Sequence, residues 1–503
     1  MANLNSLLDT AVTLHRANQL QEAKSIYERI LEINPNHFDA LQLLGTIASQ
    51  TKNYCQAIQL FDSAIRINSQ YAGIYNNRAT TFQALGKFEN ALQDFNQSIV
   101  LNPTDAQTYN NRGNTLKELG RLDDAILDFN RAISIQPSYA LAYNNKGNAL
   151  KEKRKISEAL DCFEKATSLN PNLIEALWNK SLILLLLGNY EQGWEMFEYR
   201  LHPSLVGKIC DHREFLFPKW DGHQSINGKK ILIFSEQGLG DTIQFCRFIK
   251  LLSDRGANVI FEVQEPLYEL LQKLDGVHLL IKKGEPPPPC DFYYPLLSLP
   301  NLFQITLNNS LQRSSYIFST PHQAKKWNER LIEYKKLRVG LVWSGGLRPT
   351  QPENWAINNR RNIPFKFLAN LCDLNIDFFS LQKGAQAESE FNEQKDFYWQ
   401  RDNLVDFSAG LVDFSETAAL IENLDLVISV DTSTAHLAAA MGKETWLLNR
   451  FDSCWRWLIS SEESPWYPSI RIFSQPNAGD WATVIEKVKQ ELIKRINYGN
   501  YSK

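Results

Sequence analysis

A glycine-containing turn between an expected strand and an expected helix is the first place where this sequence could carry chemistry. The segment ILIFSEQGLGDTIQF, residues 231–245, passes from apolar residues through Gly238 and Gly240 to Asp241. Glycines let the main chain turn sharply and approach a ligand closely. The segment lacks the third glycine of a dinucleotide fingerprint, because Ile243 stands there, and it lacks the Lys-Ser/Thr pair of a phosphate loop. Asp241 either takes part in chemistry or caps the helix that follows.

A second segment places hydroxyl groups and a histidine at the start of another expected helix. In LDLVISVDTSTAHLAAAMGKETWLL, residues 424–448, an apolar strand ends at Asp431, and Thr432 and Ser433 open a helix of small residues. Free main-chain N–H groups and hydroxyls at a helix start suit a pyrophosphate. His436 follows Thr432 by four residues, so the two lie on the same face of the expected helix, near its start. The alternative is a capped helix with a structural histidine.

Two further segments are candidates on more general grounds. The sequence WSGG, residues 343–346, follows an expected strand, and ligands of α/β folds bind at the carboxyl ends of strands. We therefore expect Ser344 and Gly345 to approach the ligand. Arg456 lies in the aromatic-rich segment FDSCWRWL, where it contacts an acceptor or phosphate, or else forms a cation–π pair with a neighbouring tryptophan.

The elements that must position these residues alternate from Lys230 onward between short apolar runs and amphipathic helical segments. Such alternation predicts parallel sheets covered by helices. The expected strands span 231–235, 259–263 and 277–281 in a first half, and 338–343, 377–381, 427–430 and 445–448 in a second. The expected helices span 242–252, 266–273, 364–372, 416–423 and 435–441. The pattern predicts two Rossmann-like lobes with a ligand cleft between them.

A 34-residue period fills the chain before this α/β part. It appears in three series: Ala23, Ala57, Ala91, Ala125 and Ala159; Gly45, Ala79, Gly113 and Gly147; and Pro35, Pro103, Pro137 and Pro171. The glycines at 86, 120 and 188 mark the turn inside a unit. We expect six pairs of antiparallel helices, starting near residues 3, 37, 71, 105, 139 and 173. The pattern resembles the tetratricopeptide repeat, which implies an all-α solenoid with a concave groove.

Asparagines recur on the first helix of the expected pairs, among them Asn77, Asn111 and Asn145. An amide side chain can hold a peptide backbone through paired donor and acceptor contacts. The alternative is that these are solvated polar positions. The repeats indicate binding of a peptide or protein, without identifying it.

The two motifs of the α/β part, in this order and 190 residues apart from Asp241 to Asp431, resemble glycosyltransferase family 9, the heptosyltransferases. The resemblance covers roughly residues 230 to 480. It implies a GT-B fold that transfers a sugar from a nucleotide-sugar with inversion and without a metal. It implies that Asp241 is the catalytic base, and that the donor is bound by Asp431, Thr432, Ser433 and His436.

The same resemblance implies two basic contacts to the donor. In RRNIPFKFL the family's phosphate-contacting residue, three positions before a proline, corresponds to Arg361. In SLQKG, after a central strand of the donor lobe, Lys383 would touch the nucleotide. The family has no repeat array, and this chain departs from it there. The expected organisation is repeats at 1–201, a connector at 202–229, an acceptor-side lobe at 230–335 and a donor-binding lobe at 336–503.

The resemblance and the repeats together predict an inverting, metal-independent glycosyltransferase whose repeats recruit a protein or peptide acceptor. Protein O-GlcNAc transferases join similar repeats to a GT-B half, so this expectation is an architectural analogy. One alternative is a non-catalytic repeat scaffold with a degenerate transferase domain. Another is an epimerase or other nucleotide-sugar enzyme, which would need no acceptor.

The composition of the 503 residues sets limits on other functions. The net charge of -3 gives no reason to expect nucleic acid, and seven scattered cysteines suggest reduced thiols in a cytoplasmic protein. We expect no signal peptide, and no membrane span, because the longest apolar run is 182–187. We expect no metal, since there is no D-x-D motif, and no cofactor beyond the nucleotide-sugar co-substrate.

Overall fold

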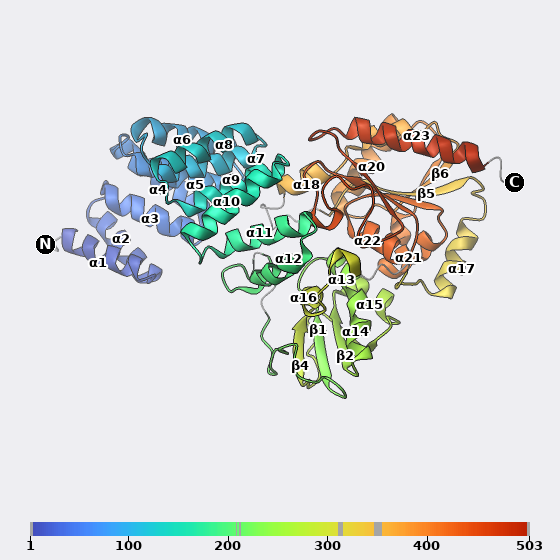
Figure 1. Cartoon of the computed structure of the whole chain (residues 1–503). Helices are drawn as coiled ribbons and strands as arrows, with labels where there is room; N and C mark the ends of the chain where they lie inside the picture. The colour runs from blue at the N-terminus through green and yellow to red at the C-terminus, as the bar shows by residue number, and fades with distance from the viewer. Residues whose placement is uncertain (1–3, 208, 211–212, 310–314, 347–354, 500–503) are drawn as a thin grey trace. The chain divides into compact units, whose positions relative to one another are not determined.

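The chain forms two compact units, Met1–Ala176 and Leu177–Lys503. Figure 1 shows the computed structural model, which describes residues 4–207, 209–210, 213–309, 315–346 and 355–499. In these described ranges, no helix combines the length and the apolar character needed to cross a bilayer. The first unit is entirely helical, and the second contains both parallel sheets. The predicted fold class, a helical solenoid followed by an α/β part with two Rossmann-like lobes, is therefore confirmed.

Antiparallel helix pairs follow one another through the first unit and into the second. Within the described residues there are six pairs, and each begins one residue after its predicted start. They are α1 (Leu4–Arg16) with α2 (Leu20–Ile33), α3 (Phe38–Gln50) with α4 (Tyr54–Ile67), α5 (Ala72–Ala84) with α6 (Phe88–Leu101), α7 (Ala106–Glu118) with α8 (Leu122–Ile135), α9 (Ala140–Glu152) with α10 (Ile156–Leu169), and α11 (Ile174–Leu186) with α12 (Tyr190–Phe197). The sixth pair lies almost wholly in the second unit, so the repeats extend beyond the first.

The 34-residue period reflects the close crossing of the two helices in a pair. A Cβ added to Gly113 would lie 2.6 Å from the ring of Phe129, and one added to Gly147 would lie 2.7 Å from the ring of Phe163. Real Cβ atoms do not approach so closely, so these positions need a small residue opposite the aromatic ring. The alanines of the second helices are fully buried. A left-handed residue ends the first helix of each pair, a glycine at 86, 120 and 188 and Asn18, Lys52 or Arg154 in the others.

The N-terminal lobe of the second unit is a parallel sheet with strand order β3-β2-β1-β4 among the described residues. Its strands are β1 (Lys230–Phe234), β2 (Asn258–Val263), β3 (Val277–Lys282) and β4 (Phe292–Pro295). Its helices are α13 (Leu239–Phe245), α14 (Ile249–Asp254), α15 (Glu265–Leu271) and α16 (Leu299–Leu302), with the 3-10 turns η2 (Cys246–Phe248) and η3 (Leu296–Ser298). The sequence did not predict β4, which is only four residues long.

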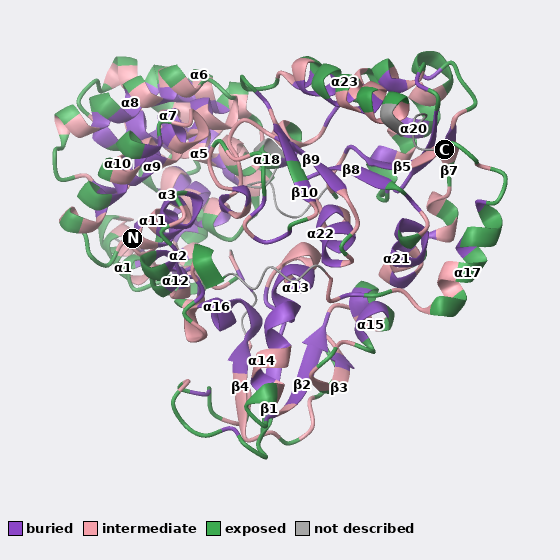
Figure 2. Ribbon diagram, turned by 45° about the vertical axis from the view of Figure 1, so that its right-hand side comes forward, coloured by how far each residue is buried: buried purple, intermediate pink, exposed green. Residues whose placement is uncertain are grey.

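The C-terminal lobe is a larger parallel sheet with strand order β10-β9-β8-β5-β6-β7 in the part that the structure describes. Its strands are β5 (Leu337–Val342), β6 (Ile376–Ser380), β7 (Leu404–Asp406), β8 (Leu426–Val430), β9 (Thr445–Asn449) and β10 (Ile470–Ser474). Its helices are α17 (Pro321–Arg330), α18 (Trp355–Arg361), α19 (Phe365–Leu368), α20 (Ala385–Tyr398), α21 (Phe414–Glu422), α22 (Ser433–Ala440) and α23 (Trp481–Gly499), with the 3-10 turn η8 (Trp455–Trp457). The inner strands are buried on both faces, as Figure 2 shows in purple.

This strand order creates a topological switch point between β5 and β8. The chain winds outward from β5 in one direction through β6 and β7, and in the other through β8, β9 and β10. Loops that leave adjacent strands at a switch point diverge to opposite faces and open a crevice, which is where open α/β sheets bind ligands. The loops that follow β5 and β8 carry Gly345 and Asp431.

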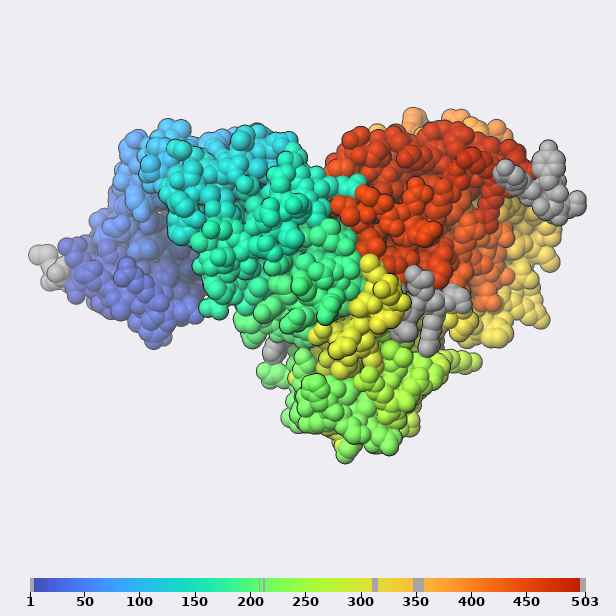
Figure 3. All heavy atoms as spheres, viewed as in Figure 1, coloured from blue at the N-terminus to red at the C-terminus, as the bar shows by residue number. Residues whose placement is uncertain are grey.

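The last helix pair is built into the second unit by an aromatic cluster. Trp194 of α12 is fully buried, and its ring packs edge-on against Phe245 of α13 and Trp455 of η8, with centroids 6.1 and 5.3 Å apart. Tyr190, one turn earlier, stacks on Trp466 at 5.5 Å. Figure 3 shows the green surface of α12 meeting the yellow and orange-red surfaces of the two lobes. This helix therefore belongs to the core that joins the lobes.

Replacing Trp194 by alanine should lower the free energy of unfolding of the second unit by about 3 to 5 kcal/mol, the usual loss for a large buried aromatic side chain. All 12 tryptophans lie in the second unit, so tryptophan fluorescence during urea unfolding follows this unit alone. Phe397→Ala is the control, because this side chain is 72% exposed, and it should change little. A loss below about 1 kcal/mol for Trp194→Ala would show that α12 is dispensable to the unit.

Candidate functional site

A cavity of about 410 Å³ lies between the two lobes of the second unit, where α13 meets α22. Nine of the predicted site residues line it: Gly238, Gly240, Asp241, Gly345, Arg361, Asp431, Thr432, Ser433 and His436. The remaining lining residues are Leu239, Gly346, Ile357, Asn358 and Arg456. Residues that are up to 218 positions apart in the sequence thus share one cavity, and both lobes contribute to it.

The N-terminus of α22 supplies main-chain donors to this cavity. Thr432 caps the helix, and its hydroxyl accepts from the amide of Ala435 at 3.5 Å and lies 3.0 Å from the hydroxyl of Ser429. The amides of Ser433 and Thr434 have no acceptor among the described residues. Free amides at the start of a helix that follows a buried strand favour an anion. The capping interpretation of Thr432 is therefore confirmed, and anion binding by the free amides stays a prediction.

Arg361 connects the segment that follows β5 with the loop that follows β8. Its Nη1 donates to the carbonyl oxygen of Asp431 at 3.1 Å, and its Nη2 donates to Asn358 at 2.5 Å. A Cβ on Gly345 would lie 2.0 Å from Nη2. A side chain at this position would therefore force the guanidinium of Arg361 to move.

The loop after β5 is fixed by side-chain amides that the sequence did not reveal. The oxygen of Gln382 accepts from the amides of Trp343 and Ser344 at 3.1 and 2.9 Å, and its nitrogen donates to the carbonyl of Ser344 at 2.9 Å. Asn362 accepts from the amide of Gly345 at 2.9 Å. Gln382 is buried, so these bonds are shielded from water. They pre-organise the backbone of Gly345 beside Arg361.

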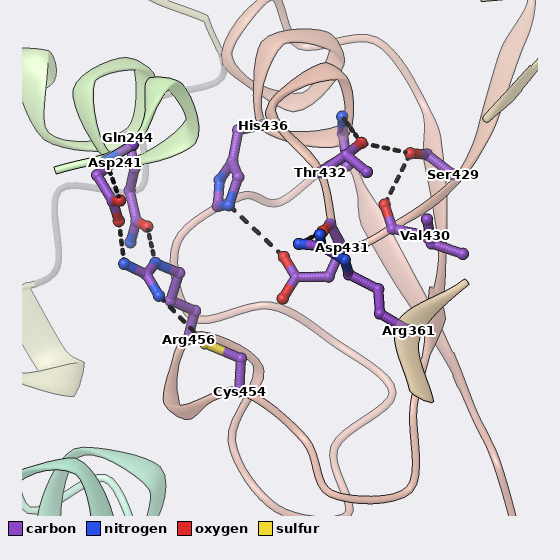
Figure 4. A network of polar contacts seen from close by, with 12 residues as sticks. Asp241, Gln244, Arg361, Ser429, Val430, Asp431, Thr432, His436, Cys454 and Arg456 are labelled. Atoms are coloured by element: carbon purple, nitrogen blue, oxygen red, sulfur yellow. Dashed lines mark hydrogen bonds and ion pairs between the residues drawn. The ribbon is translucent and has the colours of Figure 1, made fainter. Parts of the chain in front are cut away.

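Asp241 joins the two lobes through a bond that crosses the cavity. It is the third residue of α13, whose cap is Gly238, and one carboxylate oxygen accepts from the amide of Gly238 at 3.0 Å. The other oxygen forms a short ion pair with Arg456 of the C-terminal lobe. Arg456 also donates to Gln244 at 2.9 Å and lies 4.3 Å above the ring of Trp455. Figure 4 shows Asp241 and Gln244 facing Arg456 together. The cation–π alternative for Arg456 is thus confirmed, and a bond to Asp241 is added to it.

His436 lies beneath this ion pair and is almost completely buried. Its Nδ1 is 3.0 Å from the hydroxyl of Tyr467, and its ring stacks on Trp457 with centroids 5.2 Å apart. Its Nε2 lies 3.8 Å from a carboxylate oxygen of Asp431, beyond hydrogen-bonding distance. Figure 4 marks this contact with a dashed line. A Cβ on Gly240 would lie 2.9 Å from the imidazole ring, so this glycine lets α13 approach α22.

Burial sets the protonation state of His436. Desolvation lowers its pKa from 6.5 to about 4, and the attraction of Asp431 offsets only part of this. Asp241 on α13 also favours the charged form, whereas Arg456 and Arg247 on other elements oppose it. His436 is therefore neutral at neutral pH, and it interacts as a hydrogen-bonding group and not as a cation.

Two predicted donor contacts lie away from the cavity. Lys383 follows β6, is half-exposed, and directs its ammonium to the carbonyl of Ser408 at 3.0 Å and to Glu388 at 3.6 Å. Ser344 does not line the cavity, since its hydroxyl donates to the carbonyl of Gly345 at 3.2 Å. The roles given to both residues stay predictions.

The predicted asparagines of the repeats bond across successive pairs. Asn111 donates to Asn76 at 3.3 Å, and Asn145 donates to Asn110 at 2.9 Å. Asn77 is half-buried on α5. Amide side chains therefore bond between neighbouring first helices at two places, a role that the sequence did not predict. Peptide binding by these residues stays a prediction.

Metal binding was not expected from the sequence. In the described part of the chain, no three His, Cys, Asp or Glu side chains gather as potential ligands of a metal ion. The cavity holds two carboxylates, Asp241 and Asp431, and each lies beside a basic or aromatic group already described. The expectation of a metal-independent site stays a prediction.

The buried neutral histidine should make the stability of the second unit depend on pH. An unfolded chain binds a proton at His436 below about pH 6.5, whereas the folded protein does so only below about pH 4, so stability falls as the pH falls between these values. From about pH 7 to about pH 4.5 the wild type should lose roughly 2 to 3 kcal/mol more than His436→Gln, as measured by urea unfolding. The exposed His322→Gln is the control. Equal losses in wild type and His436→Gln would contradict a neutral His436.

Comparison with known families supports the two-part organisation. Tetratricopeptide repeat models match residues 14–77, 81–120, 113–154 and 140–173. The model of glycosyltransferase family 9 (heptosyltransferase) matches residues 402–448, from β7 into β9. That match includes the switch-point segment with Asp431 and His436, but not Asp241 or Arg361.

One similar curated protein is Protein FlbA of Caulobacter vibrioides, which is 27% identical over 342 residues. The alignment covers 62% of this chain and 54% of FlbA, so the chain spans about half the length of this relative. Similar solved structures include YrrB, a repeat protein with an unusual peptide-binding site (25% identity, 35% of this chain, 91% of that chain, TM-score 0.31). A repeat protein of Thermus thermophilus is another (21% identity, 36% of this chain, 99% of that chain, TM-score 0.33).

The two parallel sheets agree with an α/β glycosyltransferase fold, and the match at residues 402–448 lies in the sheet that forms the switch point. The chain therefore combines tetratricopeptide repeats in its N-terminal part with a C-terminal segment that matches glycosyltransferase family 9.

Proposed function

We propose that the cavity between the lobes binds a nucleotide-sugar, and that the protein transfers its sugar to an acceptor hydroxyl with inversion. The observation that carries the proposal is the convergence of Asp241, Arg361, His436 and the free N-terminus of α22 on one cavity at a switch point. The partial family match adds independent support, because it includes the α22 segment. These groups provide both halves of a sugar-transfer site, a base and a cradle for the leaving group.

The C-terminal lobe would bind the diphosphate of the donor. The amides of Ser433 and Thr434 offer two N–H donors, and the Arg361 guanidinium lies beside them on the carbonyl of Asp431. His436 adds a neutral donor at the base of the cavity. As the bond from the anomeric carbon to the diphosphate breaks, the leaving group gains negative charge, which fixed donors stabilise without having to reorganise.

The N-terminal lobe would supply the base. In an inverting transfer the acceptor oxygen attacks the anomeric carbon from the face opposite the diphosphate, and its proton passes to a carboxylate. Asp241 lies on α13, across the cavity from α22, and its position is fixed by Gly238 and Arg456. The bond to Arg456 places a guanidinium of the C-terminal lobe beside the base, where an incoming diphosphate would compete for it. Release of Arg456 would free the Asp241 oxygen for the acceptor.

The acceptor would be a protein or peptide bound by the repeats. The described residues that line the cavity all follow the repeats in the sequence, from Gly238 onward. Its regular helix pairs suit an extended chain, and the first helices carry amides at a constant 34-residue spacing. We include the cytoplasmic location and the absence of a metal requirement in the proposal as expectations from the sequence.

A non-catalytic scaffold is the second candidate, and one observation favours it. Both carboxylate oxygens of Asp241 already have partners, the amide of Gly238 and Arg456. In a degenerate site this aspartate would serve only to hold the lobes together. The two candidate functions differ in what they predict when the charge of Asp241 is removed. A transferase would lose turnover, whereas a scaffold has no turnover to lose.

Asp241→Asn should abolish most of the transfer or hydrolysis of a nucleotide-sugar, by roughly 100- to 10,000-fold in kcat, because general-base catalysis contributes that much. The measurement is nucleoside diphosphate release from a panel of ADP-, UDP-, GDP- and dTDP-sugars. Asp452→Asn is the matched control, since Asp452 also pairs with an arginine, Arg360, but does not line the cavity. Its turnover should stay close to that of the wild type.

Calorimetry with the same diphosphates separates the two candidates. If the wild type binds a diphosphate and turns its sugar over, and Asp241→Asn binds but does not, Asp241 is the base. If the wild type binds no diphosphate, or binds one but has no turnover with any donor and acceptor, the scaffold is the better description.

Gly345→Ala should weaken diphosphate binding by roughly 10- to 150-fold, because the new Cβ displaces the Arg361 guanidinium and a charged hydrogen bond contributes about 1.5 to 3 kcal/mol. Gly410→Ala is the control, because a Cβ there also meets a guanidinium, that of Arg330 at 3.0 Å, but Gly410 does not line the cavity. The measurement is the Kd by calorimetry. Equal affinities of the two variants would show that Arg361 does not contact the donor.

A further inference from the structure

A buried cluster of one arginine and two tyrosines lies next to the imidazole of His436. Arg247, in η2 of the N-terminal lobe, is buried and donates to the carbonyl of Trp466 at 2.7 Å and to the hydroxyl of Tyr316 at 2.9 Å. Its guanidinium lies 4.5 Å from the ring centroid of Tyr467. The hydroxyl of Tyr467 in turn lies 3.0 Å from His436 Nδ1. The proposed mechanism uses none of these groups except His436.

The direction of these bonds follows from the donors available at each step. An arginine can only donate, so the Tyr316 oxygen accepts from Arg247. The Tyr316 hydrogen has a good acceptor in the carbonyl of Ile243 at 3.0 Å. Among the described residues, the Tyr467 hydrogen then has one acceptor at short distance, His436 Nδ1. Nδ1 is therefore the unprotonated nitrogen, and Nε2 carries the proton.

The opposite tautomer would leave Tyr467 poorly bonded. If Nδ1 donated to Tyr467, the one other acceptor for the Tyr467 hydrogen among the described residues would be the Tyr316 oxygen at 3.5 Å, which is at the outer limit for such a bond and already accepts from Arg247. Burial also raises the pKa of the Tyr467 hydroxyl, so it keeps its hydrogen. A buried hydroxyl without an acceptor is unfavourable, and this disfavours the Nδ1–H form.

The geometry points to Tyr467 as a positioning residue, which fixes the Nε2–H tautomer of His436 so that a neutral imidazole donates a hydrogen bond to the diphosphate. The inference rests on the proposed function for the identity of the ligand, but not for the tautomer. Trp457 holds the plane of the ring, and Gly240 leaves the space in which its edge reaches the cavity. The Nε2–H group of His436 is thus oriented before a ligand binds, because Nδ1 accepts from Tyr467 and Nε2 carries the proton.

The charged groups around His436 are consistent with a donor that stays neutral. Asp431 lies 3.8 Å from Nε2 on the preceding loop, Asp241 lies on α13, and Arg456 and Arg247 approach from two other elements. Two carboxylates and two guanidinium groups leave no large local charge. A neutral N–H can bind a diphosphate here without bringing another charge into a crowded cavity.

The test is long-range ¹H–¹⁵N correlation NMR of the full chain labelled with ¹⁵N-histidine, with His436→Gln to assign the His436 signals. The correlation pattern of a neutral imidazole identifies which nitrogen is protonated. We expect Nε2–H in the wild type, a mixture of both tautomers in Tyr467→Phe, and unchanged Nε2–H in Tyr316→Phe, which removes a hydroxyl from the same cluster without touching His436. Nδ1–H in the wild type, or Nε2–H alone in Tyr467→Phe, would overturn the inference.

Titration with inorganic pyrophosphate then tests where the proton points. The wild-type Nε2–H signal should shift, and Tyr467→Phe should bind pyrophosphate more weakly by roughly 2- to 12-fold, the value of one net hydrogen bond. If pyrophosphate binds and leaves the Nε2–H signal unchanged, His436 does not contact the ligand and the inference fails. If the Nε2–H tautomer is found but no diphosphate or pyrophosphate binds, the proposed function fails while the tautomer assignment stands. Should Tyr467→Phe not fold, as judged by tryptophan fluorescence, the wild-type tautomer alone decides.

Discussion

The ion pair between Asp241 and Arg456 is the contact on which the arrangement of the site depends. It joins α13 of one lobe to η8 of the other across the cavity, and both side chains are largely shielded from water. A buried ion pair is stable only when further hydrogen bonds satisfy its remaining donors and acceptors. Gly238 and Gln244 supply them from α13, and Trp455 covers the guanidinium.

The last helix pair packs against the segments that carry the Asp241–Arg456 ion pair. Trp194 of α12 packs against both Phe245, at the end of α13, and Trp455, next to Arg456. Arg200, in the 3-10 turn η1 (Glu198–Leu201) after α12, is completely buried and donates to Glu236 in the turn after β1 at 2.6 Å. The end of the repeat array therefore holds two segments of the site, the glycine turn and the loop of Arg456. The end of the 34-residue period and the edge of the first compact unit do not coincide, for this physical reason.

Periodic features of this molecule could be predicted from its sequence. The phase of the helix pairs was predicted to within one residue, because small residues opposite Phe129 and Phe163 have to recur with the repeat. Most strands were predicted from apolar runs, but β4, β7 and β10 were not. Two of these, β4 and β7, are only four and three residues long, too short to give a clear apolar run. The start of α13 was placed three residues late, because its cap is Gly238, whose identity gives little capping signal.

The sequence predicted the site residues that follow strands or begin helices. It did not predict the side chains that hydrogen-bond to them. Gly238, Asp241 and the segment from Asp431 to His436 came together because parallel strands and switch points place such residues at one edge. Gln382, Gln244 and Tyr467 act through contacts between distant segments, and no local pattern distinguishes them from ordinary buried polar residues. For Lys383, the sequence pattern gave the position of a basic residue after a strand but not the direction of its side chain. The structure shows that its ammonium group donates to the carbonyl of Ser408.

The most direct test of the central claim is a crystal structure of the protein with the nucleoside diphosphate that binds most tightly among ADP, UDP, GDP and dTDP. The account predicts diphosphate oxygens within hydrogen-bonding distance of the amides of Ser433 and Thr434, of Arg361 and of His436 Nε2. It also predicts that the sugar side of the diphosphate faces Asp241. A nucleotide bound elsewhere on the protein, with this cavity empty at saturating concentration, would contradict the account.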